Sequence, residues 1–355
     1  MWPRSDLTDL LGIDHPIIQA PMAGSDGPVL AAAVSNAGGV GSLGCGEMSA
    51  EKLREEFDKT RASTTRPFII NFFAHDTPVF PSDDAASMRK QLAIYYEELG
   101  LGQDLTLSAS PMRSFDAAML EAVLDLRPEI VSFHFGLPSE EMLDALKSAG
   151  SIILCSATTV TEARKLEAGG VHAIIAQGYD AGGHRGTFST PVDAGNVGTF
   201  ALIPQIVDAV SVPVIAAGGI ADGRGIAAAF ALGASGVQMG TAFLLCPESA
   251  ASPIHRQVLQ QARDDSTVVT RAFTGRPART IVNRFVEEMA PQDREVPAFP
   301  LQDSLTLPLH FESVAQGSKD FAALFSGQAS ALSRTLPAGE LVDALVAEAQ
   351  KILGR

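Results

Sequence analysis

The residues best placed for chemistry lie in one glycine-rich loop, 177–186, with the sequence QGYDAGGHRG. Two adjacent glycines, Gly182 and Gly183, allow the backbone to pass close to a ligand because they carry no side chain. His184 follows them directly, and histidine is the side chain whose proton affinity suits acid–base chemistry near neutral pH. The alternative is an ordinary exposed loop histidine. Because the loop follows an apolar, strand-like segment, we favour a catalytic role for His184.

Further glycines follow two other short apolar segments. Gly218 and Gly219 come directly after one of them, and Gly240 and Thr241 come directly after the other. The alanine-rich stretch 226–232 between them has a helical pattern, so the unit is predicted to be strand, helix, strand with a right-handed crossover. Glycines after both strands let backbone N–H groups approach an anion such as phosphate. They could instead only form tight turns, but two such pairs one unit apart favour a phosphate site.

Three side-chain amides stand at or near the ends of predicted strands: Asn71, Gln177 and Gln238. A buried neutral amide without a hydrogen-bond partner is costly, so each needs a partner. Each amide could cap backbone groups at the rim of the fold. Three of them at equivalent strand ends would also suit a flat heteroaromatic ring with several donors and acceptors.

A regular alternation of apolar segments and helical patterns positions these residues. Eight segments have the length and composition of buried strands: 17–20, 40–44, 67–73, 130–135, 152–156, 173–176, 213–217 and 236–239. Helical patterns are predicted at 28–37, 52–60, 115–126, 140–148, 161–168, 202–210 and 226–232. Strict alternation with unbroken apolar strands indicates a parallel sheet covered on its outer face. Eight units predict a (β/α)8 TIM barrel, whose active site lies at the C-terminal ends of the strands.

The remaining segments do not follow this alternation. Residues 74–114 are too long for an ordinary connection, so we predict an insertion after strand three that contains a helix at 85–99. We divide the chain into a barrel (1–246), a mainly helical or irregular subdomain (247–335) and a C-terminal helix packing on the barrel (336–355). Within the subdomain we expect proline-rich loops over 275–308 and a helical pattern near 311–325.

Composition excludes several classes of function. The chain has 355 residues, is 46% hydrophobic and 19% charged, and carries a net charge of −15. Such an acidic globular protein is not expected to bind nucleic acid or an anionic membrane. The three cysteines, Cys45, Cys155 and Cys246, have no metal-ligand spacing and are expected to be buried thiols. With no signal-peptide-like or membrane-spanning segment, a cytoplasmic location is expected.

Some catalytic machineries are also missing from the pattern. The predicted strand ends show no paired carboxylates and no metal-ligand cluster, and the glycine loops lack the lysine and hydroxyl of a P-loop. An aldolase would need a lysine at a strand end, and none stands there. A phosphate site without such groups points to a phosphate-bearing cofactor that performs the chemistry itself. An isomerase, or a barrel that binds a phosphate-bearing molecule without catalysis, remains open.

Several of these motifs together resemble one known family. QAPMAG after strand one, NFF in strand three, QGYDAGGHRG after strand six and AAGGI…GVQMGTAF at strands seven and eight are similar to nitronate monooxygenase, formerly 2-nitropropane dioxygenase. The resemblance runs in order over the barrel, about two thirds of the chain. A late element, 325–328, falls where the family has a Gly-Gln pair.

The resemblance implies a non-covalently bound FMN and a detoxifying oxidation of alkyl nitronates, such as propionate 3-nitronate, by O2 to a carbonyl compound and nitrite or nitrate. It assigns His184 as the active-site histidine. The residues it implies for FMN are Gly218, Gly219, Gln238, Met239, Gly240 and Thr241 at the phosphate, Pro21, Met22 and Ala23 along the ring, and Asn71, Gln177, Gly182 and Gly183 at the ring or ribityl chain. No metal is implied.

One alternative shares the architecture. FMN-dependent reductases that take hydride from NAD(P)H, including enoyl-thioester and quinone reductases, use the same type of barrel. Arg185, next to His184, favours the nitronate oxidation over the reductase. The expected partners are the small-molecule nitronate and O2, and the chain is expected to be a monomer or a small homo-oligomer.

Overall fold

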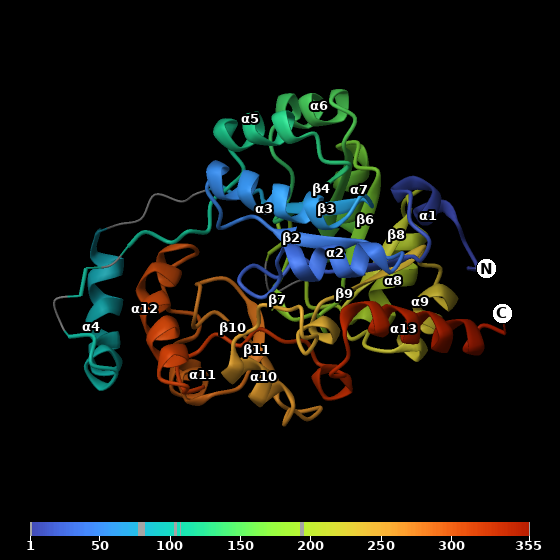
Figure 1. Cartoon of the computed structure of the whole chain (residues 1–355). Helices are drawn as coiled ribbons and strands as arrows, with labels where there is room; N and C mark the ends of the chain where they lie inside the picture. Colours follow the sequence, from blue (N-terminus) through green and yellow to red (C-terminus); the bar gives the residue numbers. More distant parts are fainter. Residues whose placement is uncertain (1, 77–81, 103–104, 107, 192–194, 355) are drawn as a thin grey trace.

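A computed structural model of the chain describes residues 2–76, 82–102, 105–106, 108–191 and 195–354. Part of the insertion predicted at 74–114 therefore lies outside the described residues. Figure 1 shows the architecture, with a strand barrel on one side and helices α4 and α12 on the other. No helix in the described part of the chain is long and apolar enough to span a bilayer.

Eight parallel strands form the barrel, in the order β1-β9-β8-β6-β5-β4-β3-β2. A parallel bridge between Ile18 and Val40 joins the first and last strands of this order. The predicted (β/α)8 TIM barrel is confirmed. The strands are β1 (Ile17–Gln19), β2 (Gly41–Gly44), β3 (Phe68–Phe73), β4 (Ile130–His134), β5 (Ile152–Ala157), β6 (Ala173–Gln177), β8 (Val214–Ala217) and β9 (Gly236–Met239).

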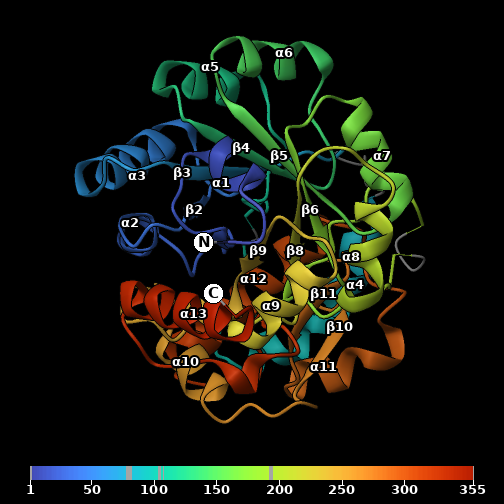
Figure 2. The same cartoon turned by 90° about the vertical axis from the view of Figure 1, so that its right-hand side faces the viewer.

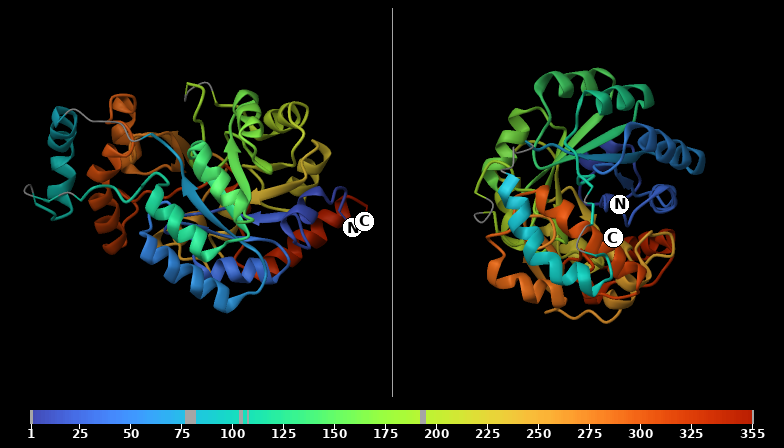
Figure 3. Two further views of the ribbon diagram at one scale, coloured as in Figure 1. Left: turned by 90° about the horizontal axis from the view of Figure 1, so that it is seen from above. Right: turned by 90° about the vertical axis from the view of Figure 1, so that its left-hand side faces the viewer.

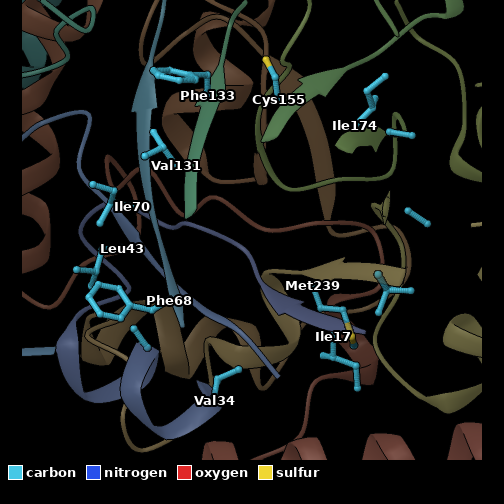
Figure 4. Close-up of a cluster of buried hydrophobic side chains, with 14 of the residues drawn as sticks. Ile17, Val34, Leu43, Phe68, Ile70, Val131, Phe133, Cys155, Ile174 and Met239 are labelled. Carbon is cyan, nitrogen blue, oxygen red and sulfur yellow. The ribbon is translucent and has the colours of Figure 1, made fainter. Parts of the chain in front are cut away.

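The strands are apolar on both faces because two hydrophobic layers cover them. Inside the barrel, Ile18, Ile69 and Ile215 belong to one buried cluster, which α1 (Asp6–Leu11) joins through Leu7 and Leu11. A larger cluster fills the space between the strands and the surrounding helices, and Figure 4 shows part of it. Continuous burial of this kind is what an unbroken apolar strand predicts.

Helices surround the strands, as seen from the end of the barrel in Figure 2. Several begin at a side chain that accepts a backbone N–H, for example Asp116 from Met119 at 2.8 Å, which satisfies a donor left free at a helix start. The helices are α2 (Pro28–Asn36), α3 (Ala50–Ser63), α5 (Ala117–Leu126), α6 (Glu140–Ser148), α7 (Val160–Ala168), α8 (Thr199–Val207) and α9 (Gly223–Ala231). All three cysteines are buried and free, as expected.

The C-terminal third is more ordered than the sequence suggested. A three-stranded sheet, β10-β11-β7, joins β10 (Thr267–Thr270) and β11 (Ala278–Ile281) to β7 (Gly183–His184) of the loop after β6. The loops predicted over 275–308 are wrong where β11, α11 (Arg284–Met289) and the start of α12 (Leu301–Ala315) lie, whereas residues 293–300 form a loop as predicted. The helical pattern near 311–325 is also wrong beyond Ala315. Prolines mislead here because α12 accommodates Pro308 within its length.

Burial of apolar side chains stabilises α12 despite its proline. Leu305 and Leu309 pack in a hydrophobic cluster with residues of α4 (Ser82–Glu98) and α11. Tyr96 of α4 also donates its hydroxyl to the carbonyl oxygen of Leu305 at 2.6 Å. The two helices lie side by side, away from the chain termini, in both Figure 1 and Figure 3.

The remaining elements complete the C-terminal part. They are α10 (Pro253–Leu259), the short helices η2 (Thr241–Phe243), η3 (Ala290–Gln292) and η4 (Ser330–Leu332), and α13 (Ala338–Ile352). Helix α13 lies against α9, where a Cβ added at Gly223 would be only 2.3 Å from the Glu348 Cβ. The division into three domains stays a prediction.

Candidate active site

A cavity of about 510 Å3 lies at the C-terminal ends of the barrel strands. Loops of the barrel line one part of it, and residues of α10, α12 and the segment 323–329 line the rest. Every residue predicted for the site from the sequence lines this cavity. They are Pro21, Met22, Ala23, Asn71, Gln177, Gly182, Gly183, His184, Gly218, Gly219, Gln238, Met239, Gly240 and Thr241. The fold thus brings them together, and their individual roles remain predictions.

The glycine turns have backbone conformations that other residues adopt with strain. Gly218 has φ +112° and Gly219 has φ +70°, both in the region that favours glycine. The backbone N–H groups of Gly219 and Gly240 donate no hydrogen bond to any group within the described part of the chain. Two free donors beside a cavity suit an anion, as expected for a phosphate.

The three amides have different surroundings. Asn71 donates through Nδ2 to the Ser132 hydroxyl at 2.8 Å. The Oε1 of Gln238 is buried and accepts no hydrogen bond from the residues described. A buried acceptor without a partner is costly, so Gln238 is suited to receive a donor from a bound molecule.

Gln177 uses both ends of its amide within the protein. Its Nε2 donates to the carbonyl oxygen of His184 at 2.9 Å, and its Oε1 accepts from the Gly186 N–H at 2.8 Å. It therefore holds the loop after β6 in place. This is the alternative role given above, in which an amide caps backbone groups at the rim of the fold. Arg185 turns away from the cavity, is 1% exposed and donates to backbone carbonyls, among them Gly178 at 2.6 Å. Arg185 therefore cannot distinguish nitronate oxidation from the reductase reaction by contact with a substrate.

His184 lies in an aromatic surrounding at the cavity wall. Its ring centroid is 5.8 Å from those of Phe135 and Phe299, and 5.4 Å from that of Phe325. Burial, together with the charges of His134 and Arg276, lowers the pKa of His184 to about 3. The imidazole is therefore neutral at physiological pH, and it is a weaker base than a solvated histidine.

Thr274 is the hydrogen-bond partner of the His184 ring. Its hydroxyl lies 2.9 Å from Nε2 of His184 and 3.2 Å from the carbonyl oxygen of Arg276. The hydroxyl has one proton, and the shorter contact favours its donation to Nε2. The imidazole then carries its own proton on Nδ1, which makes no hydrogen bond within the described residues. This tautomer leaves His184 able to donate a hydrogen bond to a ligand.

The neighbouring histidine, His134, is fully occupied. Its Nε2 donates to the carbonyl oxygen of His184 at 3.1 Å, and its Nδ1 therefore accepts from the Ser156 hydroxyl at 2.8 Å. Burial lowers its pKa to about 3. His134 thus fixes the backbone that carries His184 and has no ring nitrogen left for a ligand.

The late glycine element closes the site from the C-terminal side. Gly327 donates its N–H to the Thr241 hydroxyl at 2.9 Å, and Gln328 donates to the carbonyl oxygen of Asp180 at 3.0 Å. A Cβ added at Gly182 would lie 2.6 Å from the Gly327 nitrogen. Gly182 is therefore required by this contact between two distant segments, in addition to any contact with a ligand.

Comparison with known proteins identifies the family. The family model described as nitronate monooxygenase matches residues 4–348. The chain belongs to the nitronate monooxygenase family. A probable nitronate monooxygenase of Staphylococcus aureus (strain MSSA476) is 40% identical over 354 residues, covering 99% of each chain. The solved structure of a nitroalkane oxidase from Streptomyces ansochromogenes has a TM-score of 0.90 at 40% identity, also covering 99% of each chain.

Membership confirms the resemblance seen in the motifs and makes the chain an oxidoreductase that acts on a small molecule. The solved structure of FabK from Thermotoga maritima is also similar, with a TM-score of 0.77 and 30% identity over 100% of this chain and 98% of that chain. The barrel is therefore shared with FabK.

Several cavity residues were not predicted as part of the site. Glu47, Thr274 and Asp303 received no role, and His255 and His310 stand in segments without a site pattern, yet all five line the cavity. Glu47 follows β2 by three residues, so its place after a strand end could have marked it. The other four come from the C-terminal third, where no local pattern indicates that their segments turn back over the barrel.

Proposed function

We propose that this protein binds FMN and oxidises alkyl nitronates with O2 to carbonyl compounds and nitrite or nitrate. The observation that carries the proposal is the cavity itself: two glycine turns with free N–H donors and the unpartnered Gln238 face the same space as His184. A phosphate-bearing ring cofactor would satisfy both features at once. The described residues that line the cavity carry no side chain that performs redox chemistry by itself, so a bound cofactor would supply it.

The cavity residues fit FMN. The backbone donors of Gly219 and Gly240 would hold its phosphate, and the Thr241 hydroxyl could donate to the phosphate while accepting from Gly327. Gln238 Oε1 would accept from the isoalloxazine ring, and Met22 with Ala23 would line that ring. When bound, the flavin would take electrons from the nitronate and pass them to O2.

His184 would orient the substrate by donating from Nδ1 to the nitro oxygens. A nitronate is already deprotonated at carbon, so its oxidation needs no strong base. The lowered pKa of His184 also makes base catalysis on a neutral nitroalkane weak. The rings of Phe135, Phe299 and Phe325 surround the imidazole and would exclude water, which strengthens the hydrogen bond to an anion.

One experiment tests both cofactor and reaction. The purified protein should be yellow and release a chromophore with the mass of FMN on heating. Under anaerobic conditions, a preformed alkyl nitronate should bleach the flavin quickly, and NADH or NADPH should do so slowly or not at all. A colourless protein that takes up no FMN on incubation contradicts the cofactor proposal.

The likeness to FabK keeps one second candidate, an NAD(P)H-dependent reductase. The same anaerobic experiment separates the two, because fast bleaching by NADH with turnover of a quinone or an enoyl thioester would favour the reductase. A neutral His184 that donates from Nδ1 to the nitro oxygens would favour the nitronate.

A further inference from the structure

Thr199 stands at the start of α8, and residues of two glycine motifs surround its hydroxyl group. A Cβ added at Gly178 would lie 2.0 Å from Oγ1 of Thr199, and a Cβ added at Gly218 would lie 2.9 Å from the same atom. The carboxylate of Asp180 accepts from this hydroxyl at 2.7 Å. The loop after β6 and the turn after β8 therefore meet at one side chain. Neither Thr199 nor Asp180 is among the residues that line the cavity.

Asp180 holds Thr199 in place through two hydrogen bonds. Its Oδ2 accepts from the backbone N–H of Thr199 at 2.7 Å, in addition to the hydroxyl. Gly198, the residue before the helix, has no side chain that accepts this N–H, so Asp180 caps α8 from a different loop. Burial acts to raise the pKa of Asp180, but the bonds from Thr199, its own N–H and the charge of Arg279 together lower it. Asp180 is therefore ionised at neutral pH, which strengthens both bonds.

The Thr199 hydroxyl also contacts the glycine turn after β8. It donates to the carbonyl oxygen of Gly218 at 3.0 Å, so its proton is shared between this oxygen and Asp180. The carbonyl of Gly218 and the N–H of Gly219 belong to one peptide unit. In a planar trans peptide these two groups point in opposite directions. The bond that holds the carbonyl therefore directs the Gly219 N–H away from Thr199.

This peptide unit needs to be held because glycines stand on both sides of it. Gly218 has φ +112° and Gly219 has φ +70°, and neither has a side chain that restricts rotation of the peptide. If the peptide turned over, its carbonyl oxygen would replace its N–H on the other side. Gly219 lines the cavity, so one hydroxyl group determines whether the turn presents a donor or an acceptor there.

We propose that Thr199, held by Asp180, positions the peptide between Gly218 and Gly219 so that its N–H faces the phosphate of FMN. The inference rests on the proposed function. Both side chains are positioning residues, since they act through the turn. The charge of Asp180 would by itself weaken the binding of a nearby phosphate, so its action through Thr199 has the opposite sign.

The test compares FMN with riboflavin, which has the same ring and ribityl chain but no phosphate. Flavin fluorescence titrations of the apoprotein give both dissociation constants. The unmodified protein should bind FMN about 100-fold more tightly than riboflavin, because hydrogen bonds to a charged group are strong. Thr199→Ala should weaken FMN binding by ~10-fold and leave riboflavin binding nearly unchanged. Thr199→Ser keeps the hydroxyl and should retain the full preference for FMN.

Two further variants separate positioning from charge and from helix capping. Asp180→Ala should weaken FMN binding by about 3-fold or more without affecting riboflavin, although it removes a negative charge beside the turn. Thr159→Ala is the matched control, because Thr159 caps α7 by accepting from the Glu162 N–H at 3.2 Å and does not line the cavity. This control should lower the thermal stability of the apoprotein and change neither dissociation constant.

Equal weakening of FMN and riboflavin in Thr199→Ala overturns the inference, because general damage to the fold affects both flavins. An unchanged preference for FMN in that variant overturns it as well. Tighter FMN binding in Asp180→Ala would show that Asp180 acts through its charge and does not position the turn. If the unmodified protein binds neither flavin, the proposed cofactor fails together with the inference. If it prefers FMN and Thr199→Ala keeps that preference, only the inference fails.

Discussion

The cavity has two sides that differ in chemistry and in origin. The barrel side consists mainly of glycines, amides and backbone donors at strand ends. The C-terminal side contributes Thr274, Asp303 and Phe325, which add a hydrogen-bond partner, a charge and an aromatic ring. The barrel side fits a cofactor, and the C-terminal side fits the control of what reaches it.

The largest effect should come from breaking the contact between the two sides. In Gly182→Ala the new Cβ would lie 2.6 Å from the Gly327 nitrogen, and the obstacle is backbone, which cannot rotate away. We expect the purified variant to lose most of its bound flavin, measured by the ratio of flavin to protein absorbance. Gly339→Ala is the control, because its Cβ would meet only Ala37 at 3.9 Å. Full flavin content in Gly182→Ala would show that the two sides do not depend on each other.

The next effect concerns His184, the residue at which the two sides meet. His184→Leu should lower kcat/KM for alkyl nitronates by ~10²-fold, because the hydrogen bond to an anion in a desolvated site is lost. Since burial lowers the pKa of His184 to about 3, the unmodified enzyme should show no inflection from this residue between pH 5 and 8. An inflection near pH 6.5 that disappears in His184→Leu would contradict the neutral state.

Thr274 allows a finer test of the same point. Thr274→Ser keeps the hydroxyl and should preserve activity, whereas Thr274→Val removes the group that fixes the imidazole tautomer. We expect Thr274→Val to raise KM for nitronates by about 10-fold, the loss of one oriented hydrogen bond. Equal kinetics in the two variants would mean that Thr274 does not position His184.

The buried carboxyl of Asp303 should have a measurable cost in stability. Burial raises the pKa of Asp303 from 3.8 to about 6, so the folded protein retains a proton that the unfolded chain has already lost between these pH values. Stability contributed by this group therefore falls as pH rises from about 4 to about 6, by up to ~3 kcal/mol. Asp303→Asn should unfold at higher urea concentration than the unmodified protein at pH 7.5 and show a smaller difference at pH 4.5.

Asp222 provides a control of opposite sign. Its pKa is lowered by its hydrogen bond to Arg224, so its contribution is present at neutral pH and is lost in acid. Asp222→Asn should therefore destabilise the protein at pH 7.5. If both variants shift stability in the same direction, the charge of Asp303 is not the cause.

The barrel side could be predicted from the sequence because its signals are local. Each strand end carries its own glycine or amide within a few residues of an apolar run, and the barrel topology then places all strand ends at one face. Gln177 shows the limit of this reasoning. Its position was predicted correctly, but its partners His184 and Gly186 became visible only with the loop conformation.

The C-terminal side could not be predicted because its contacts are non-local. Asp303 reaches the cavity only because α12 packs on α4, about 200 residues earlier in the chain, and that packing depends on Leu305 and Tyr96. Prolines in 275–308 suggested loops, whereas Asn283 caps a helix there by accepting from the Val286 N–H. The place of Asp303 at the cavity could not be recognised while its segment had no assigned position.

The smallest effect, and the sharpest test of the barrel side, concerns Gln238. Its buried Oε1 has no partner among the described residues, so it should destabilise the protein without cofactor and stabilise the complex with FMN. Gln238→Met has a similar volume and removes the acceptor. We expect the variant to weaken FMN binding by about 10-fold while leaving the apoprotein as stable as before or slightly more stable. Flavin fluorescence titration and thermal unfolding of the apoprotein measure the two quantities.

Asn71→Leu is the comparison for Gln238→Met. Asn71 already donates to Ser132, so its loss should destabilise the apoprotein as well. If Gln238→Met weakens the apoprotein to the same extent, its amide serves the fold and the barrel side is not built around a cofactor donor at that position.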